Sequence, residues 1–186
     1  MIYIIIGCSC SGKSTLVKNT FLNEPIIKFY KDITQVTETE HYFLIGNYQT
    51  NKRRVGTDTL ERKDIKFIGE QINKLYGLGK NIIAEGTRCC THNLMNGLLK
   101  YKDCKLIYLD TSIEKSLERN IKLGYTSSDK SLKHDVTMCR NFWNKYGSLL
   151  NGVRIDTNEI NDFSEFKYSS KLINNYKIKE NTIFNL

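Results

Sequence analysis

Several features are scarce or missing in this sequence of 186 residues. No run of about 18 apolar residues occurs and no basic flank precedes an apolar leader, so we expect neither a membrane span nor a secretory signal. The six cysteines include no Cys-x-x-Cys pair, and the spacing of Cys89, Cys90 and His92 suits tetrahedral zinc poorly. We therefore expect free thiols in a reducing cytoplasm, which is that of the host if the chain is viral.

Internal boundaries and acidic residues are also scarce. A single proline, Pro25, and the lack of repeats, low-complexity tracts and linker-like stretches argue for one domain over residues 1–186. The 20 acidic residues are outnumbered by 28 lysines and arginines, which gives a net charge of +8. That excess favours polyanionic partners, either nucleotides or nucleic acid, although a solubilising surface charge also explains it.

Apolar segments alternate with amphipathic ones along most of the chain. Strands are predicted at 2–6, 81–84 and 106–109, with shorter candidates at 26–30, 41–45 and 153–155. Helices are predicted at 13–22, 61–78, 94–101, 133–150 and, in the tail, 163–176. From this alternation we expect an α/β three-layer sandwich whose sheet is mainly parallel and five-stranded.

One more helix is predicted directly after the strand that ends at Asp110. Thr111-x-x-Glu114 fits a capping box that opens this helix. Ile113, Leu117 and Ile121 recur on one face of this predicted helix.

The stretch GCSCSGKST follows the first predicted strand and matches the Walker A pattern Gly-x-x-x-x-Gly-Lys-Ser of a phosphate-binding loop. Small residues let backbone amides turn inward around a phosphate, and the helix that begins at Lys13 presents its free amides to the same anion. Lys13 would reach the β- and γ-phosphates, Ser14 would hold Mg²⁺, and Thr15 would contact the α-phosphate. The predicted ATP-binding residues are Gly7, Cys8, Ser9, Cys10, Ser11, Gly12, Lys13, Ser14 and Thr15.

Phosphate chemistry also needs a carboxylate near Mg²⁺, commonly at the end of a neighbouring strand. Two predicted strands end in one: NIIAEGTR at Glu85 and KLIYLD at Asp110. We favour Glu85 as a catalytic residue that holds Mg²⁺ through water, because Gly86 allows close approach and Arg88 supplies a charge. The alternatives are a purely structural Glu85, and an Asp110 that helps to start the following helix.

The basic residues late in the chain predict a lid. No Asn/Thr-Lys-x-Asp motif of GTPases follows a strand, and the chain is short for a helicase or an AAA-type motor. Residues 119–154 carry seven basic and two acidic side chains, a net charge of +5, and residues 124–131 are polar. We expect a lid-like helical segment at 119–145 that closes over a triphosphate, although a solvated helix face explains the same charges. The lid residues would be Arg119, Lys122, Lys133 and Arg140, with Arg119 also catalytic.

Residues 46–64 are dense in hydrogen-bonding groups and predict an acceptor-binding loop. Asp58 is a candidate base for an acceptor hydroxyl or a cap for the helix that follows, and both roles remain open. Tyr48 would stack on a base, and two arginines would bind an acceptor phosphate. The predicted substrate-binding residues are Tyr48, Arg53, Arg54, Thr57, Asp58 and Arg88.

This layout resembles the P-loop kinases of the adenylate and guanylate kinase type over most of residues 1–157. More narrowly, GNYQTNKRRVGTDTL, NIIAEGTR and KLIYLDTSIEKSLERN resemble bacteriophage kinases that phosphorylate the hydroxymethyl group of 5-hydroxymethyluracil in DNA. The resemblance implies a nucleoside monophosphate kinase-like fold, ATP bound by Gly7–Thr15, an acceptor loop at Tyr48–Thr59 and lid contacts from Arg119 onward.

We therefore expect an ATP- and Mg²⁺-dependent kinase that transfers the γ-phosphoryl group to a nucleotide hydroxyl, namely the hydroxymethyl group of a modified pyrimidine (5-hydroxymethyluracil) in DNA. One alternative is a nucleoside or nucleoside monophosphate kinase that acts on free nucleotides. Another, of a different class, is an ATP-gated nucleic-acid-binding protein, which would hydrolyse ATP without any phosphorylated acceptor.

Overall fold

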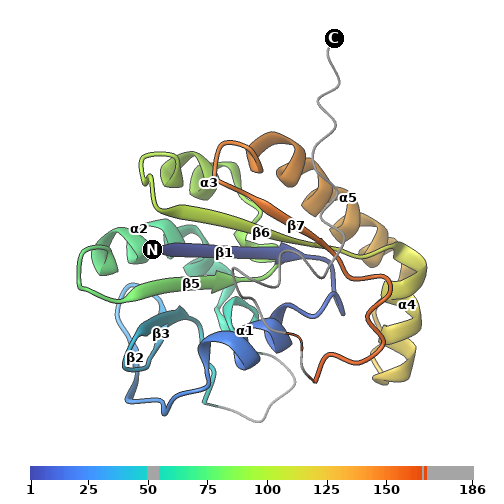
Figure 1. Ribbon diagram of the computed structural model, residues 1–186, viewed down its shortest axis with the longest axis horizontal. Coiled ribbons are helices and arrows are strands. Elements are labelled where there is room, and N and C mark those ends of the chain that lie inside the picture. Colours follow the sequence, from blue (N-terminus) through green and yellow to red (C-terminus); the bar gives the residue numbers. More distant parts are fainter. Residues whose placement is uncertain (50–54, 165, 167–186) are drawn as a thin grey trace.

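The computed structural model describes residues 1–49, 55–164 and 166 of the chain. Strands and helices alternate along the chain and build an α/β fold (Figure 1). The strands in this part are β1 (Ile2–Gly7), β2 (Lys28–Lys31), β3 (Gln35–Glu38), β4 (Tyr42–Ile45), β5 (Asn81–Glu85), β6 (Cys104–Asp110) and β7 (Val153–Asp156). The helices are α1 (Lys13–Phe21), α2 (Ile68–Leu75), α3 (His92–Leu98), α4 (Ile113–Lys122) and α5 (Asp129–Tyr146), with the short 3-10 helices η1 (Thr57–Thr59), η2 (Arg62–Phe67) and η3 (Thr87–Cys89).

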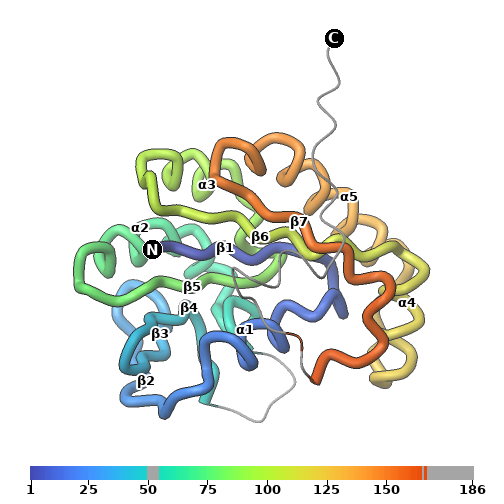
Figure 2. Tube along the Cα trace, in the orientation of Figure 1, coloured from blue at the N-terminus to red at the C-terminus, as the bar shows by residue number. Residues whose placement is uncertain are grey.

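The sheet has seven strands in the order β2-β3-β4-β5-β1-β6-β7, which corrects the expected five. Strands β4, β5, β1, β6 and β7 pair in parallel, whereas β2 and β3 add an antiparallel extension beside β4. Figure 2 shows β2, β3 and β4 together at one edge of the sheet. The sequence prediction missed β3 because Gln35–Glu38 contains a single strongly apolar residue, Val36.

The alternation of side chains along β1 divides the core between the two faces of the sheet. Ile2, Ile4 and Ile6 belong to a cluster formed with residues of α2, α3 and α5. Ile5 belongs to a second cluster, which residues of α1 complete. Figure 1 shows the same division, with α2, α3 and α5 on one side of the sheet and α1 on the other. The expected three-layer arrangement is therefore present.

The buried residues of helix α4 lie beside the face that carries its apolar residues. Ser116, Arg119 and Asn120 are buried, whereas Ile121 is 69% exposed. Ile113 and Leu117 are half-buried, so the apolar face is covered only in part. The physical reason is that the inward face makes hydrogen bonds rather than apolar contacts: Ser116 Oγ donates to the carbonyl oxygen of Ser9 at 2.6 Å.

The start of α4 also differs from the prediction. Ser112, not Thr111, is the N-cap, because its Oγ accepts from the backbone N–H of Lys115 at 3.1 Å. The Thr111 hydroxyl instead pairs with the hydroxyl of Thr157 at 2.6 Å. The predicted capping box is therefore wrong by one residue.

The remaining helices follow their predictions with shifted bounds. The segment predicted as one helix over 61–78 divides into η2 and α2, and α5 begins and ends four residues before the predicted 133–150 because Ser128 caps it. The tail helix predicted at 163–176 lies largely outside the described residues.

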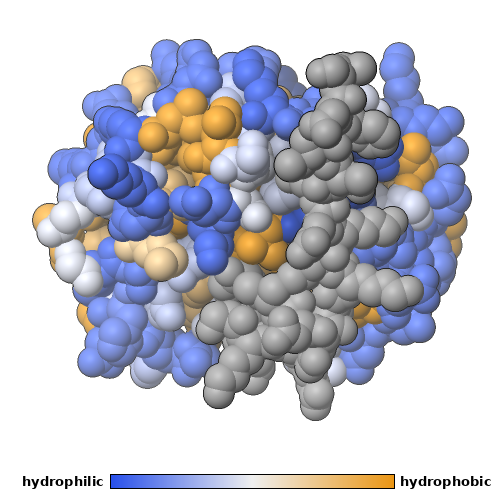
Figure 3. All heavy atoms as spheres, turned by 45° about the horizontal axis from the view of Figure 1, so that its top comes forward, coloured by the Kyte–Doolittle hydropathy of each residue, from blue (hydrophilic) through white to orange (hydrophobic). Residues whose placement is uncertain are grey.

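In the part of the chain that the structure describes, no helix combines the length and apolar character needed to cross a bilayer. The face in Figure 3 is mostly hydrophilic, with small separate apolar patches.

Candidate active site

The loop between β1 and α1 has the conformation that its small residues allow. Gly12 precedes α1 with φ 95°, and Cys10 has φ 60°. Gly7 lies so close to β6 that an added Cβ would be 2.9 Å from the carbonyl oxygen of Leu109. The predicted ATP-binding residues Gly7–Thr15 thus run as one tight turn from strand into helix, and the first amides of α1 lack intrahelical acceptors. This is the geometry that an anion at a helix N-terminus requires.

Lys13 is the first residue of α1, and its side chain folds back over the loop. Only 8% of it is exposed, and Nζ donates to the carbonyl oxygen of Cys8 at 2.7 Å. Burial lowers the pKa of Lys13, but the negative charges of Glu85 and Asp58 outweigh burial and leave it above the ordinary value. The loop therefore carries a fixed, buried cation.

Glu85 ends β5, the parallel neighbour of β1, opposite Ile5. Its side chain is 1% exposed, and Oε1 accepts from the hydroxyls of Ser14 at 3.0 Å and Tyr48 at 3.4 Å. Among the described residues, nothing hydrogen-bonds to its buried Oε2. Burial raises the pKa of Glu85 to about 7, against the opposing attraction of Lys13.

These observations test whether the site suits Mg²⁺. Magnesium prefers oxygen ligands and commonly binds through one or two carboxylates and retained waters beside phosphates. The Ser14 hydroxyl and the Glu85 carboxylate supply such oxygens side by side, and a buried carboxylate oxygen without a partner is costly unless something binds it. The donor set therefore fits Mg²⁺.

Asp110, the rival carboxylate, has other partners. It accepts from the hydroxyl of Tyr108 at 2.8 Å and from Nε of Arg154 at 3.0 Å. These contacts tie β6 to its neighbour β7, and the N-cap of α4 is Ser112. The carboxylate of Asp110 thus joins β6 to β7 at the edge of the sheet. Of the two candidate carboxylates, Glu85 is the one that contacts the phosphate-binding loop.

The described part of the acceptor segment packs directly on Glu85. Two glycines make this close approach possible: a Cβ on Gly56 would be 2.5 Å from Glu85 Oε1, and one on Gly86 would be 2.4 Å from Thr57 Oγ1. Thr57 Oγ1 donates to the carbonyl oxygen of Glu85 at 2.6 Å. The ring of Tyr48 is buried with its hydroxyl toward Glu85, so it presents no exposed face for the predicted base stacking. The predicted Arg53 and Arg54 lie outside the described residues.

Asp58 and Arg88 face each other at the edge of this segment. The Asp58 side chain is 47% exposed, and its Oδ1 lies 3.9 Å from Nε of Arg88. Arg88 also donates through Nη1 to the carbonyl oxygens of Thr57 at 3.1 Å and Leu60. Neither η1 nor η2 has a side-chain cap, so the predicted role of Asp58 as a helix cap is wrong. Its half-exposed carboxylate is instead open to a ligand.

Arg119 is the predicted lid residue that the structure brings to the phosphate-binding loop. Its guanidinium is buried, donates to the carbonyl oxygens of Thr157, Ile160 and Cys10, and lies over the ring of Phe163 at 4.7 Å. It thereby joins the loop to the segment after β7. The side chains of the other three predicted lid residues, Lys122, Lys133 and Arg140, are exposed.

Similarity to known proteins is confined to solved structures. No protein-family model and no curated protein matches this chain. Among solved structures, 14 chains match. One is the structure of deoxyadenosine kinase from M. mycoides with bound dATP, at 13% sequence identity and a TM-score of 0.43, covering 84% of this chain and 91% of that chain.

Asp135 on α5 is a half-buried carboxylate that the sequence analysis did not single out. It lies one helical turn before Cys139, which is fully buried and hydrogen-bonds to the backbone of Gly7. Burial raises the pKa of Asp135, the charge of Lys13 lowers it, and the charge of Asp58 raises it. The helix thus brings a third carboxylate within electrostatic reach of Lys13. Its spacing with Leu132 and Cys139 on the inward face was the available signal.

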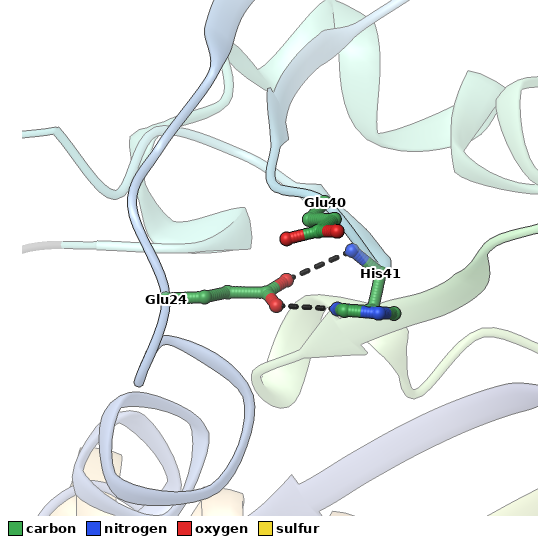
Figure 4. Close-up of side chains that lie close together, drawn as sticks. All are labelled: Glu24, Glu40 and His41. Carbon is green, nitrogen blue, oxygen red and sulfur yellow. Dashed lines mark hydrogen bonds and ion pairs between the residues drawn. The ribbon is translucent and has the colours of Figure 1, made fainter.

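A second polar cluster joins the loop after α1 to the turn between β3 and β4. Glu24 accepts from the backbone N–H of His41 at 2.9 Å and pairs with His41 Nδ1 at 2.6 Å, and Glu40 lies beside them (Figure 4). Hydrogen bonds from His41 and Thr39 help to lower the pKa of Glu24 to about 2 despite the opposing effect of burial. These contacts explain the cluster as a structural tie.

Proposed function

We propose that this protein is an ATP- and Mg²⁺-dependent P-loop kinase that transfers the γ-phosphoryl group to a hydroxyl of a nucleoside or nucleotide. The observation that carries this proposal is the contact between Ser14 Oγ and Glu85 Oε1 at 3.0 Å, with Oε2 of the same carboxylate unpartnered among the described residues. It joins a phosphate-binding loop to a buried carboxylate on the adjacent parallel strand.

The donor half of the reaction belongs to residues 7–15. The amides of Gly12, Lys13 and Ser14 would surround the β-phosphate at the N-terminus of α1. Lys13 now bonds the Cys8 carbonyl, and it would exchange that acceptor for the β- and γ-phosphate oxygens. Ser14 and Glu85 would hold the magnesium ion, which neutralises charge on the phosphates when it is bound.

The acceptor half belongs to Asp58 and Arg88. Asp58 would accept the proton of the acceptor hydroxyl while the oxygen of that hydroxyl attacks the γ-phosphorus. The bond between the γ-phosphorus and the β–γ bridging oxygen breaks, and ADP leaves with the electron pair of that bond. Arg88 would orient the Asp58 carboxylate, which lies 3.9 Å from it, or bind a phosphate of the acceptor.

The finer proposal is that the acceptor is the hydroxymethyl group of 5-hydroxymethyluracil in DNA. Its support is the resemblance of residues 46–60 to phage DNA kinases and the net charge of +8, because each added cation strengthens binding to a polyanion. A free nucleoside or nucleoside monophosphate is the alternative acceptor. Lys13, Asp58, Glu85 and Arg88 would have the same roles with either acceptor.

The test is transfer of label from ATP radiolabelled at the γ-phosphate, with nucleosides, nucleoside monophosphates and hydroxymethylated DNA as acceptors. We expect label in one of these pools with wild type, and loss of transfer by at least about 100-fold in Lys13→Met. Lys18→Met is the matched control, because Lys18 is an exposed lysine on the same helix. Release of labelled phosphate with no labelled acceptor would contradict the kinase and favour the ATP-gated binding protein.

A further inference from the structure

A groove of about 480 Å³ lies on the α2 and α3 side of the sheet, apart from the phosphate-binding loop. One wall comes from η2 and α2 and includes Arg62, Lys66 and Asn73. The other comes from the start of α3 and includes Thr91 and Asn93. None of these five residues is among the predicted site residues, although Arg62 lies in the acceptor segment 46–64.

Two glycines keep the groove open. Apart from chain neighbours and the backbone of the same helix, no described atom lies within 4 Å of the position that a Cβ would take at Gly97. At Gly69 only Leu94 Cδ1 does so, at 3.5 Å. Both glycines line the groove, one from each wall. Because both glycines line the groove, a larger side chain at either position would project into this space.

The groove begins at the C-terminal end of the acceptor segment. Arg62 opens η2 four residues after Asp58, and Thr91 caps α3 three residues after Arg88. Arg88 itself ties the two walls together where they start, because its Nη1 donates to the carbonyl oxygen of Leu60, two residues before Arg62. Both walls of the groove therefore start within a few residues of Asp58 and Arg88 along the chain.

The chemistry of the walls suits a nucleotide. Arg62 and Lys66 put two cations on one wall against the single anion Glu70, and the facing wall offers the amide of Asn93 and the hydroxyl of Thr91. Cations favour phosphates, and amides and hydroxyls bond sugar and base edges. Pockets for small ligands span about 300 to 1,000 Å³, so this volume holds about one nucleotide unit.

We infer that the groove binds the nucleotide adjacent to the reacting one, so that the preferred acceptor is a nucleic-acid strand rather than a free nucleoside. This inference rests on the proposed function for the reacting hydroxyl. It assigns the phosphodiester to Arg62 and Lys66 and the neighbouring sugar and base to the α3 wall. The catalytic residues keep the roles given above.

The experiment compares acceptors that carry the same reactive hydroxyl and differ in length: a nucleoside, a dinucleotide and a longer single strand. With wild type we expect KM to fall by at least about tenfold from nucleoside to dinucleotide and little further beyond it, since the groove holds about one unit. Gly97→Leu fills the groove and should remove that gain while KM for the nucleoside changes by less than about twofold. Thermal unfolding of Gly97→Leu checks that the fold is retained.

A charge test complements the steric one. Lys66→Ala should weaken the binding of a fluorescent oligonucleotide by about three- to tenfold. It should also reduce the slope of log affinity against log salt concentration by about 1, the amount expected for one lost phosphate contact. Lys102→Ala, which removes an exposed lysine outside the groove, should leave both unchanged. Wild-type KM values that do not depend on acceptor length would overturn the inference, and so would equal losses of oligonucleotide affinity in Lys66→Ala and Lys102→Ala. Neither result would contradict the proposed kinase activity. If no acceptor is phosphorylated, the proposed function fails, and the binding measurement still decides on the groove.

Discussion

Replacing Glu85 by Gln should make the protein more stable and less active. Glu85 is buried, and its pKa is raised from 4.5 to about 7. The folded state therefore holds the carboxyl proton more tightly than the unfolded chain, so ionisation of Glu85 destabilises the fold as the pH rises through this interval. At about 1.4 kcal/mol for each pKa unit, the full effect above pH 7 is about 3 kcal/mol.

Gln cannot ionise, so the variant should escape this loss. An unpaired amide N–H in place of Oε2 costs about 1 kcal/mol, which leaves a net gain of about 2 kcal/mol at about pH 8. Near pH 5 the wild-type carboxyl is largely protonated and the gain should vanish. Activity should fall by about 100-fold or more, because the amide is a poor substitute for the carboxylate beside Ser14.

The assay is urea unfolding of both proteins, followed by circular dichroism at about pH 5 and about pH 8. The difference between the two free energies of unfolding should change by about 2 to 3 kcal/mol across this interval. A difference that does not change with pH would refute the reasoning. It would mean that Glu85 does not exchange its proton in this range, and that a charged partner besides Lys13 offsets its burial.

Three further predictions concern His41, Gly12 and Arg119. His41→Gln should lower the melting temperature near pH 6 and have less effect near pH 9. The hydrogen bond to Glu24 raises the pKa of His41. The contribution of charged His41 to stability is therefore present below about pH 6.5 and is lost as the pH rises through the pKa of the folded state. Gly12→Ala should abolish ATP binding, measured by calorimetry, and lower the free energy of unfolding by about 1 to 3 kcal/mol, measured by thermal unfolding. The reason is that φ of Gly12 is 95° and an added Cβ would lie 2.3 Å from a ring carbon of Phe163. Gly97→Ala is the control, and we expect it to be neutral or mildly stabilising. Arg119→Lys should destabilise the fold by about 2 to 4 kcal/mol in urea, because a single ammonium cannot reach three carbonyls and also stack; an unchanged midpoint would contradict that clamp.

The features that the sequence predicts well are those in which local chemistry fixes geometry. The spacing from Gly7 to Ser14 after an apolar strand identifies the loop, because the same small residues that a tight turn requires also mark it in sequence. The glycine after Glu85 favours this carboxylate over Asp110, and in the structure Gly86 does allow Thr57 to approach. Both inferences rest on backbone sterics, which act over a few residues.

The features that the sequence could not predict depend on partners distant along the chain. The inward face of α4 follows from hydrogen bonds of Ser116 and Arg119 to the loop, which no periodicity reveals. The pKa of Asp135 depends on the charges of Lys13 and Asp58, which are more than 70 residues away in the sequence. Strand β3 is polar and short, and it exists because β2 and β4 pair with it on either side.

Calorimetric titration of ATP with Mg²⁺ into the wild-type protein and into Lys13→Met tests the central claim most directly. The account predicts one site per wild-type chain, weakened at least about tenfold in Lys13→Met and unchanged in Lys18→Met. Absence of binding to the wild type, or equal affinity in Lys13→Met, would contradict the claim that Gly7–Thr15 hold a triphosphate.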